Sequence, residues 1–418
     1  MRTVEIGNPA DSGFDAERLQ RIDRFLDETY LDAGRLKTMQ LLVSREGQPV
    51  HYSQGGTLRD DGTPMREDAL FRIASMTKPV TSIAFMQLVE QCKVALDDPV
   101  ARVLPEFEGL GAYAGGGGDL PFAPSKPGRP MRFVDLMSHM SGLTYGFQNR
   151  SSVDAAYRAA RLDLSRAAIT SDEYIAKLAR IPLEFEPGSQ WNYSVSTDVL
   201  GVCVERLSGM TLGDYFRENI FAPLGMDDTG FDIDPAEQDR LADAYAYRPV
   251  QPPRLIDKGA ETRLMEPASF HSGGGGLIST LADYDRFCTM LVNRGAYDGG
   301  QIVAPKTMDL MVANHLPGGA DLTQVSRSMF SEASNAGTGF GLGFAVVTDP
   351  ARTLIPASKG EFYWGGAYST AFFVDPVERI TCVFMTQLYP SSTFPIRRQL
   401  KTLIYSALTH SNAGASPS

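Results

Sequence analysis

Hydrophobic side chains recur along the chain in two rhythms, and their order predicts the architecture. At residues 14–33 the apolar positions come three or four residues apart, which is the stripe of an amphipathic helix. Short apolar runs at 39–43 and 49–52, on either side of Gly47, instead predict the two strands of a hairpin. Further strands are predicted only near the C-terminus, at 343–348, 369–374 and 379–386. A last helix is predicted at about 395–408.

The middle of the chain shows helical periodicity, interrupted by loops rich in glycine and proline. The predicted helices lie at 80–92, 172–180, 195–208, 213–221 and 281–294. Strands at both ends with helices between them predict an α/β protein. We expect a sheet domain formed by 1–85 and 335–418, with a mainly helical domain, 86–334, inserted between its two parts.

Composition and charge narrow the class of protein. The 418 residues are 43% hydrophobic and 21% charged, as in ordinary globular proteins. The net charge of −11 argues against nucleic acid as a partner, because phosphate binding needs a basic surface. No apolar stretch has the length of a membrane span, and the first residues lack the apolar core of a secretory signal. Four widely spaced cysteines are predicted to be buried free thiols, so we expect a cytoplasmic protein: Cys92, Cys203, Cys288 and Cys382.

The run Ser75-Met76-Thr77-Lys78 carries the main candidate chemistry. A serine hydroxyl is protonated at neutral pH, so it becomes a nucleophile only beside a group that takes its proton. Residues three apart on a helix share a face, which would place the Lys78 amine within reach of Ser75. Residues 80–89 are apolar on nearly every side and predict a buried helix, whose N-terminus favours developing negative charge. The four residues alone also fit a helix cap followed by a solvated lysine.

Tyr193 is a candidate for the second proton-transfer group. It lies just before the predicted helix at 195–208. A tyrosine held by a lysine can act first as a base and then as an acid. A packed aromatic residue at the start of a helix is the alternative interpretation.

Trp364-Gly365-Gly366 precedes a predicted strand and offers a third candidate element. Two glycines allow the backbone to approach a ligand closely. A backbone N–H in this segment, together with that of Ser75, can form an oxyanion hole. The alternative is a glycine bulge beside a buried tryptophan.

In order and rough spacing these elements resemble those of the serine β-lactamase and penicillin-binding-protein superfamily. Within it the chain is most similar to the family VIII carboxylesterases, which resemble class C β-lactamases. The resemblance spans about residues 15–405, and further segments that support it are 135–146, 223–226 and 272–277. It implies a β-lactamase-like fold in which an antiparallel sheet is flanked by helices, with the active site in the cleft beside a mainly helical domain.

The resemblance also implies roles for individual residues and no metal or cofactor. Ser75 would be the nucleophile, Lys78 its activator and Tyr193 the partner acid and base. The backbone N–H groups of Ser75 and Ala367 would form the oxyanion hole. The substrate pocket would be lined by Tyr145, Trp364, Gly365 and Gly366.

Two departures from the β-lactamases favour an esterase acting on small, short-chain, neutral esters through an acyl-enzyme. Val195 stands where they carry the asparagine of Tyr-x-Asn, and Trp364 replaces the lysine of Lys-Thr-Gly. That lysine would hold a β-lactam carboxylate, whereas tryptophan offers an apolar wall. Weak cephalosporin hydrolysis, a β-lactamase or DD-peptidase, and an acyltransferase to an alcohol remain alternatives. Retention of all three catalytic residue types argues against a non-catalytic binding protein. The expected partner is a small ester, and the oligomeric state stays open.

Overall fold

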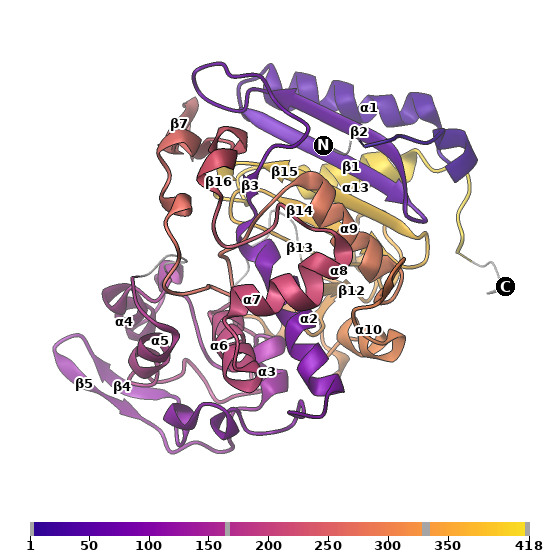
Figure 1. The fold of residues 1–418 in the computed structure, drawn as a ribbon. Helices are drawn as coiled ribbons and strands as arrows, with labels where there is room; N and C mark the ends of the chain where they lie inside the picture. Colours follow the sequence, from indigo (N-terminus) through magenta and orange to yellow (C-terminus); the bar gives the residue numbers. More distant parts are fainter. Residues whose placement is uncertain (1–3, 164–167, 328–334, 414–418) are drawn as a thin grey trace.

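The computed structural model describes residues 4–163, 168–327 and 335–413, and its main body contains a seven-stranded sheet. Neighbouring strands are antiparallel throughout, in the order β11-β12-β13-β14-β15-β1-β2. Their bounds are β1 Thr38–Arg45, β2 Gln48–Gly56, β11 Thr338–Phe340, β12 Ala345–Val347, β13 Phe362–Gly365, β14 Ala371–Asp375 and β15 Ile380–Thr386. The N-terminal hairpin β1–β2 lies beside the C-terminal strand β15, so both ends of the chain build one sheet (Figure 1). The predicted fold class is confirmed, and the two-domain division stays a prediction.

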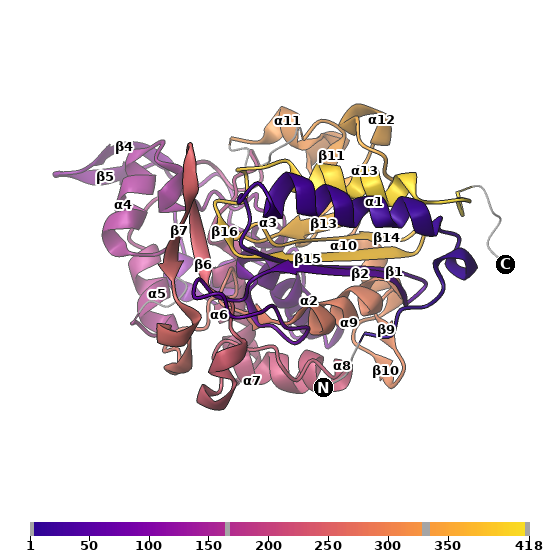
Figure 2. The ribbon, with the colours of Figure 1, turned by 90° about the horizontal axis from the view of Figure 1, so that it is seen from above.

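Helices cover both faces of this sheet. Figure 2 shows α1 and α13 side by side over one face, with α2 and α9 beneath the other. These helices are α1 Ala16–Leu26, α2 Thr77–Glu90, α9 Leu281–Val292 and α13 Ile396–Ser406. Every residue of β1 is buried, because Leu41 and Val43 pack with α1 and α13 while Leu42 faces α2 and α9. The predicted helix at 14–33 corresponds to α1 followed by a π-helical turn, Asp27–Leu31.

Helix α2 runs through the centre of the molecule. Residues Thr77 to Leu88 are all buried, as the apolar pattern predicts. The helix packs against α6, and α6 in turn packs against α3 and α7. The remaining helices are α3 Phe133–Met137, α4 Ser152–Ala160, α5 Ser171–Leu178, α6 Ser196–Ser208, α7 Leu212–Phe216, α8 Ala222–Leu224, α10 Pro305–Met311, α11 Leu322–Val325 and α12 Pro350–Thr353. Because Ser75 precedes α2 and Tyr193 precedes α6, this packing brings the two side chains into one region.

The prediction of strands only at the two ends of the chain is wrong. In its described residues the middle contains short strands and three hairpins, β4–β5, β6–β7 and β9–β10, and the first hairpin projects at the lower left of Figure 1. These strands are β3 Phe71–Arg72, β4 Tyr113–Gly117, β5 Leu120–Pro124, β6 Ala244–Arg248, β7 Gln251–Asp257, β8 Ile278–Ser279, β9 Ala296–Tyr297 and β10 Gly300–Gln301, and β16 (Leu388–Tyr389) pairs with β6. Glycines in β4 and Pro252 and Pro253 in β7 hid the alternating pattern, and edge strands tolerate such residues.

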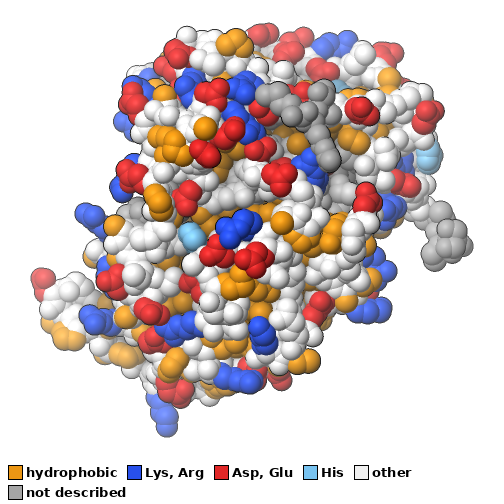
Figure 3. All heavy atoms as spheres, in the orientation of Figure 1, with side chains coloured by type: hydrophobic (Ala, Val, Ile, Leu, Met, Phe, Trp, Pro, Cys, Tyr) orange, Lys and Arg blue, Asp and Glu red, His pale blue; other side chains and the backbone are white. Residues whose placement is uncertain are grey.

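The surface and the cysteines complete the picture. Figure 3 shows positive and negative side chains intermingled over one face. All four cysteines are free, and Cys203, Cys288 and Cys382 are buried as predicted. The prediction is wrong for Cys92, which is exposed just beyond the end of α2. Across the described residues, no helix combines the length and apolar character needed to cross a membrane.

Asp285 links α9 to the sheet and should make stability depend on pH. Its carboxylate accepts hydrogen bonds from the hydroxyls of Ser44 on β1 and Thr381 on β15, each at 3.3 Å. Burial raises the pKa of Asp285 from 3.8 to about 6, against the smaller lowering effect of the two hydroxyls. Between these two values the folded state binds more protons than the unfolded state, so the free energy of unfolding falls as pH rises through this window.

An Asp285→Asn variant lacks this titration. We expect the stability of the variant relative to the wild type to rise by about 1–2 kcal/mol between pH 4.5 and pH 8. Urea unfolding at several pH values measures the change. A difference that stays constant with pH would contradict the prediction, whatever its sign.

Candidate active site

Ser75 is presented by a strand that leads directly into the buried helix. β3 pairs with β8, and the Ile73 N–H donates to the Leu277 carbonyl at 3.1 Å. Ala74 then adopts φ 44°, which is uncommon for a residue other than glycine. A short 3₁₀ turn, Ala74–Met76, follows and continues into α2. Ser75 therefore stands at the N-terminal end of a helix, as the sequence predicts.

Three predicted side chains meet at this point. The Lys78 Nζ lies 3.2 Å from the Ser75 Oγ, and the Tyr193 hydroxyl lies 2.6 Å from the same oxygen. Lys78 is 1% exposed, and its Nζ stands 4.6 Å from the centre of the Tyr193 ring. Chemically, this arrangement can take a proton from Ser75 and return it to a leaving group.

Lys78 has two further partners. Its Nζ donates to the Tyr145 hydroxyl at 3.0 Å and to the Gly274 carbonyl at 2.5 Å. Burial holds the pKa of Tyr145 well above its ordinary value, so this phenol stays protonated at neutral pH. The Gly274 carbonyl can only accept. One N–H of Lys78 is thus committed to the backbone, a contact that the sequence did not reveal.

His139 forms hydrogen bonds with the two residues on either side of Tyr193. Its carbonyl accepts a hydrogen bond from the Asn192 N–H at 2.9 Å, and its Nδ1 lies 3.1 Å from the Ser194 Oγ. The centres of the His139 and Tyr193 rings are 5.1 Å apart. Burial, and secondarily the nearby charge of Lys78, lowers the pKa of His139 well below its ordinary value. The imidazole is therefore neutral and holds the segment on both sides of Tyr193.

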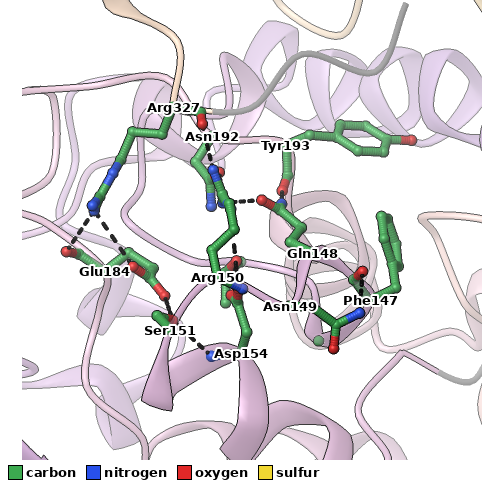
Figure 4. Close-up of polar contacts among 12 residues, drawn as sticks. Phe147, Gln148, Asn149, Arg150, Ser151, Asp154, Glu184, Asn192, Tyr193 and Arg327 are labelled. Carbon is green, nitrogen blue, oxygen red and sulfur yellow. Dashed lines mark hydrogen bonds and ion pairs between the residues drawn. The ribbon is translucent and has the colours of Figure 1, made fainter.

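Polar side chains of the neighbouring loop fix the backbone at Tyr193 (Figure 4). The Gln148 amide donates to the Tyr193 carbonyl, and Arg150 donates to the Asn192 Oδ1 at 2.8 Å. The Asn192 amide donates in turn to the Leu143 carbonyl at 3.0 Å. In Figure 4 Arg150 lies at the centre of these contacts, between Gln148 and Asn192. Backbone position just before α6 is thus set by several independent hydrogen bonds.

The turn after β13 approaches Ser75 from the other side. A Cβ on Gly366 would lie 2.4 Å from the Ile73 carbonyl, so only glycine permits this backbone contact. Ala367 follows, and among the described residues none accepts a hydrogen bond from its N–H. Ser75 and Ala367 line the same pocket. The oxyanion hole assigned to their two amides stays a prediction.

The pocket in front of Ser75 has a volume of about 540 Å³ and a largely aromatic wall. The predicted pocket residues Tyr145, Trp364, Gly365 and Gly366 all line it, together with Phe147, Trp191, Tyr193, Tyr363, Tyr368 and Tyr389. Lys78 lies behind this wall. The described residues contain no group of three or more His, Cys, Asp or Glu side chains arranged to hold a metal ion.

Sequence reasoning missed three charged residues of the pocket lining: Asp163, Asp198 and Arg397. Burial raises the pKa of Asp163, whose carboxylate accepts the backbone N–H groups of Gly146 and Phe147 at 2.9 Å. Arg397 is the single cation among the described lining residues. Asp198 carried only a weak signal, because an acid in the first turn of a predicted helix is common. Arg397 carried none.

Comparisons with known proteins concern the family and the fold. The family model described as Beta-lactamase matches residues 22–405. Esterase EstB of Burkholderia gladioli is 32% identical over 418 residues, covering 95% of this chain and 98% of EstB. Protein Rv1367c of Mycobacterium tuberculosis is 38% identical over 364 residues, covering 86% of this chain and 88% of its own. The solved structure of EstCE1, described as a hydrolase with promiscuous acyltransferase activity, has a TM-score of 0.77 and 28% identity, covering 94% of this chain and 98% of EstCE1.

Removing the Tyr193 hydroxyl tests the trio of side chains directly. Tyr193→Phe keeps the ring but loses the oxygen 2.6 Å from the Ser75 Oγ. We expect covalent labelling of Ser75 by a fluorophosphonate to slow by about 100-fold, because a positioned proton acceptor is lost. Labelling is followed by mass spectrometry of the modified peptide.

Tyr174→Phe provides the matched control for this change. Tyr174 is fully buried, and its hydroxyl also makes one hydrogen bond, to the Leu162 carbonyl at 3.2 Å. We expect this variant to be labelled at nearly the wild-type rate. Equal slowing in the two variants would show that lost packing, and not proton transfer, explains the effect at Tyr193.

Proposed function

Because the chain belongs to the beta-lactamase family, we propose that this serine hydrolase is a carboxylesterase acting on small, neutral esters. The observation that carries the proposal is the contact of Ser75 with both Lys78 and Tyr193 beside an aromatic pocket. The name of the relative EstB, an esterase, supports the same reaction class.

The proposed reaction proceeds through an acyl-enzyme. The Ser75 Oγ attacks the ester carbonyl carbon as its proton passes to the Tyr193 and Lys78 pair. The tetrahedral intermediate collapses when the C–O bond to the alcohol breaks, and the alcohol leaves with the proton held by this pair. Water then attacks the acyl-enzyme, gives its proton to the same groups, and releases the acid and free Ser75.

Backbone N–H groups are proposed to stabilise the tetrahedral intermediate. The amide of Ser75 lies in the 3₁₀ turn that continues into α2, and the N-terminal N–H groups and dipole of that helix favour negative charge. The amide of Ala367 is proposed as the second donor, since none of the described residues accepts its hydrogen bond. Gly366 supports this assignment because its missing side chain lets the turn approach Ile73, two residues before Ser75.

The lining of the pocket supports neutral esters over β-lactams. The Trp364 ring stands 5.5 Å from the Tyr193 ring, where the resemblance expects the lysine of the β-lactamases. Val195 is fully buried, so the position of the amide-binding asparagine offers no polar side chain to a substrate. A pocket of about 540 Å³ suits a small molecule.

Two alternatives have specific support. The same three residues can transfer an acyl group to an alcohol, and EstCE1 is described as having promiscuous acyltransferase activity. Arg397 favours the other alternative, because a guanidinium in the lining can receive the carboxylate of a β-lactam. Its nitrogen lies 3.3 Å from the Thr370 carbonyl, at the turn that follows β13.

Ser75→Ala tests the esterase proposal. We expect kcat/KM for p-nitrophenyl butyrate to fall by more than about 1000-fold, because the nucleophile is lost. Ser82→Ala, a change at a second buried serine of α2, should leave the rate nearly unchanged. Hydrolysis by Ser75→Ala near the wild-type rate would refute the proposal. Repeating the assay over esters of rising chain length, with and without an added alcohol, separates hydrolysis from acyl transfer.

Arg397→Gln tests the β-lactam alternative. We expect the rate with nitrocefin to fall by about tenfold, because its carboxylate loses a charged partner, while butyrate ester hydrolysis stays within about threefold. Arg398→Gln, an exposed neighbour on α13 outside the pocket lining, is the matched control. A wild-type enzyme with a higher kcat/KM for nitrocefin than for the ester would reverse the order of the two functions.

A further inference from the structure

A buried carboxylate lies behind the proposed catalytic lysine and has no part in the reaction described above. Asp198, in the first turn of α6, is 5% exposed. Its Oδ1 accepts hydrogen bonds from the Ser272 hydroxyl at 2.5 Å and from the Gly274 N–H at 3.1 Å. Burial raises the pKa of Asp198, while the charge of Lys78 and these hydrogen bonds lower it. Removing a carboxylate from water costs free energy, so a buried acid beside the site is expected to have a structural or functional role.

Gly274 connects this carboxylate to Lys78. Its N–H donates to Asp198, and its carbonyl accepts from the Lys78 Nζ at 2.5 Å. A Cβ on Gly274 would lie 2.2 Å from the Asp198 Oδ2, so the backbone meets the carboxylate at a distance only glycine permits. One peptide segment therefore transmits the position of Asp198 to the amine of Lys78.

Helix α2 also contacts the loop at 272–277, which contains Gly274. The Thr81 hydroxyl donates to the Gly273 carbonyl at 2.7 Å, and the Leu277 N–H donates to the Thr77 hydroxyl at 3.1 Å. These contacts fix the two ends of the loop. Asp198 holds the middle of the loop from α6, at Gly274, whose carbonyl faces Lys78.

We propose that Asp198 is a positioning residue for Lys78, acting by holding Gly274 so that its carbonyl occupies one N–H of the amine. The inference rests on the proposed function, in which Lys78 exchanges a proton with Ser75. A neutral amine has two N–H groups and one lone pair. With N–H groups directed to Gly274 and Tyr145, the remaining position on the nitrogen faces the Ser75 Oγ, 3.2 Å away. The charged amine donates to that oxygen, and the neutral amine can accept the hydroxyl proton there.

The geometry also separates an effect of position from an effect of charge. Both hydrogen bonds to Asp198 end on the same oxygen, Oδ1. An asparagine can place its carbonyl oxygen there and keep both bonds without a negative charge. Asp198→Asn should therefore preserve what Asp198→Ala destroys.

The test compares these two variants with the wild type in p-nitrophenyl butyrate hydrolysis and in fluorophosphonate labelling of Ser75. We expect Asp198→Ala to lower kcat by about 10- to 100-fold with KM within about twofold, because a misplaced Lys78 impairs proton transfer and not binding. The labelling rate should fall in parallel. Asp198→Asn should stay within about threefold of the wild type in both measurements.

Asp283→Ala is the matched control for the loss of a buried carboxylate. Asp283 is 2% exposed and likewise accepts from one hydroxyl, of Thr229, and one backbone N–H, of Asp228, each at 2.9 Å. Unlike Asp198, it also accepts from the Arg286 guanidinium at 2.7 Å, so its removal costs at least as many contacts. It lies on α9, outside the lining of the pocket. We expect its kcat to stay within about twofold of the wild type, although its melting temperature falls.

Three results would overturn the proposal: a folded Asp198→Ala with wild-type kcat, an Asp198→Asn no faster than Asp198→Ala, or equal losses in Asp283→Ala. If Asp198→Ala does not fold, Ser272→Ala replaces it, since it removes one of the two bonds to Oδ1, and a wild-type kcat there would count against the proposal. Labelling distinguishes this failure from failure of the proposed function. A wild type that hydrolyses no ester but whose Ser75 is labelled more slowly in Asp198→Ala would refute the esterase and retain the positioning role.

Discussion

The burial of one amine is the constraint on which the site depends. Lys78 is 1% exposed, and a buried amine needs hydrogen-bond acceptors to replace water. Its acceptors are Ser75, one turn away, and two groups distant in the sequence, at Tyr145 and Gly274. Tyr145 and Gly274 must both reach the amine within hydrogen-bond distance, so the segments that carry them are held against α2. The local chemistry thereby imposes a requirement on the fold as a whole.

The sequence was informative where side chains follow a period and silent where backbone atoms act. The stripe of α1, the apolar helix α2 and the spacing from Ser75 to Lys78 could all be predicted, because each depends on side chains close in the sequence. The Gly274 carbonyl could not, since a backbone acceptor has no residue type to mark it. The strand β7 could not be predicted for another reason. An exposed edge strand need not alternate apolar and polar residues, and it can contain proline.

The sheet contributes to the site through close backbone contact. Gly366, after β13, lies against Ile73, after β3, where even a methyl group would overlap the carbonyl. Register along β13 and β14 sets the position of this turn, with Trp364 opposite Phe372 and Gly365 opposite Ala371. Strand pairing therefore places Trp364 and the turn at Gly366 together on one side of the pocket.

The joining of both chain ends in one sheet has a consequence for synthesis on the ribosome. β1 pairs with β15, and the Asp15 N–H donates to the Ala407 carbonyl, so the first elements made wait for the last. Ser75 and Lys78 are synthesised long before the turn at Gly366 that faces them. Contacts so distant in sequence form slowly. Until β15 is made, the apolar β1 and α2 lack their partners in the nascent chain and are exposed to aggregation.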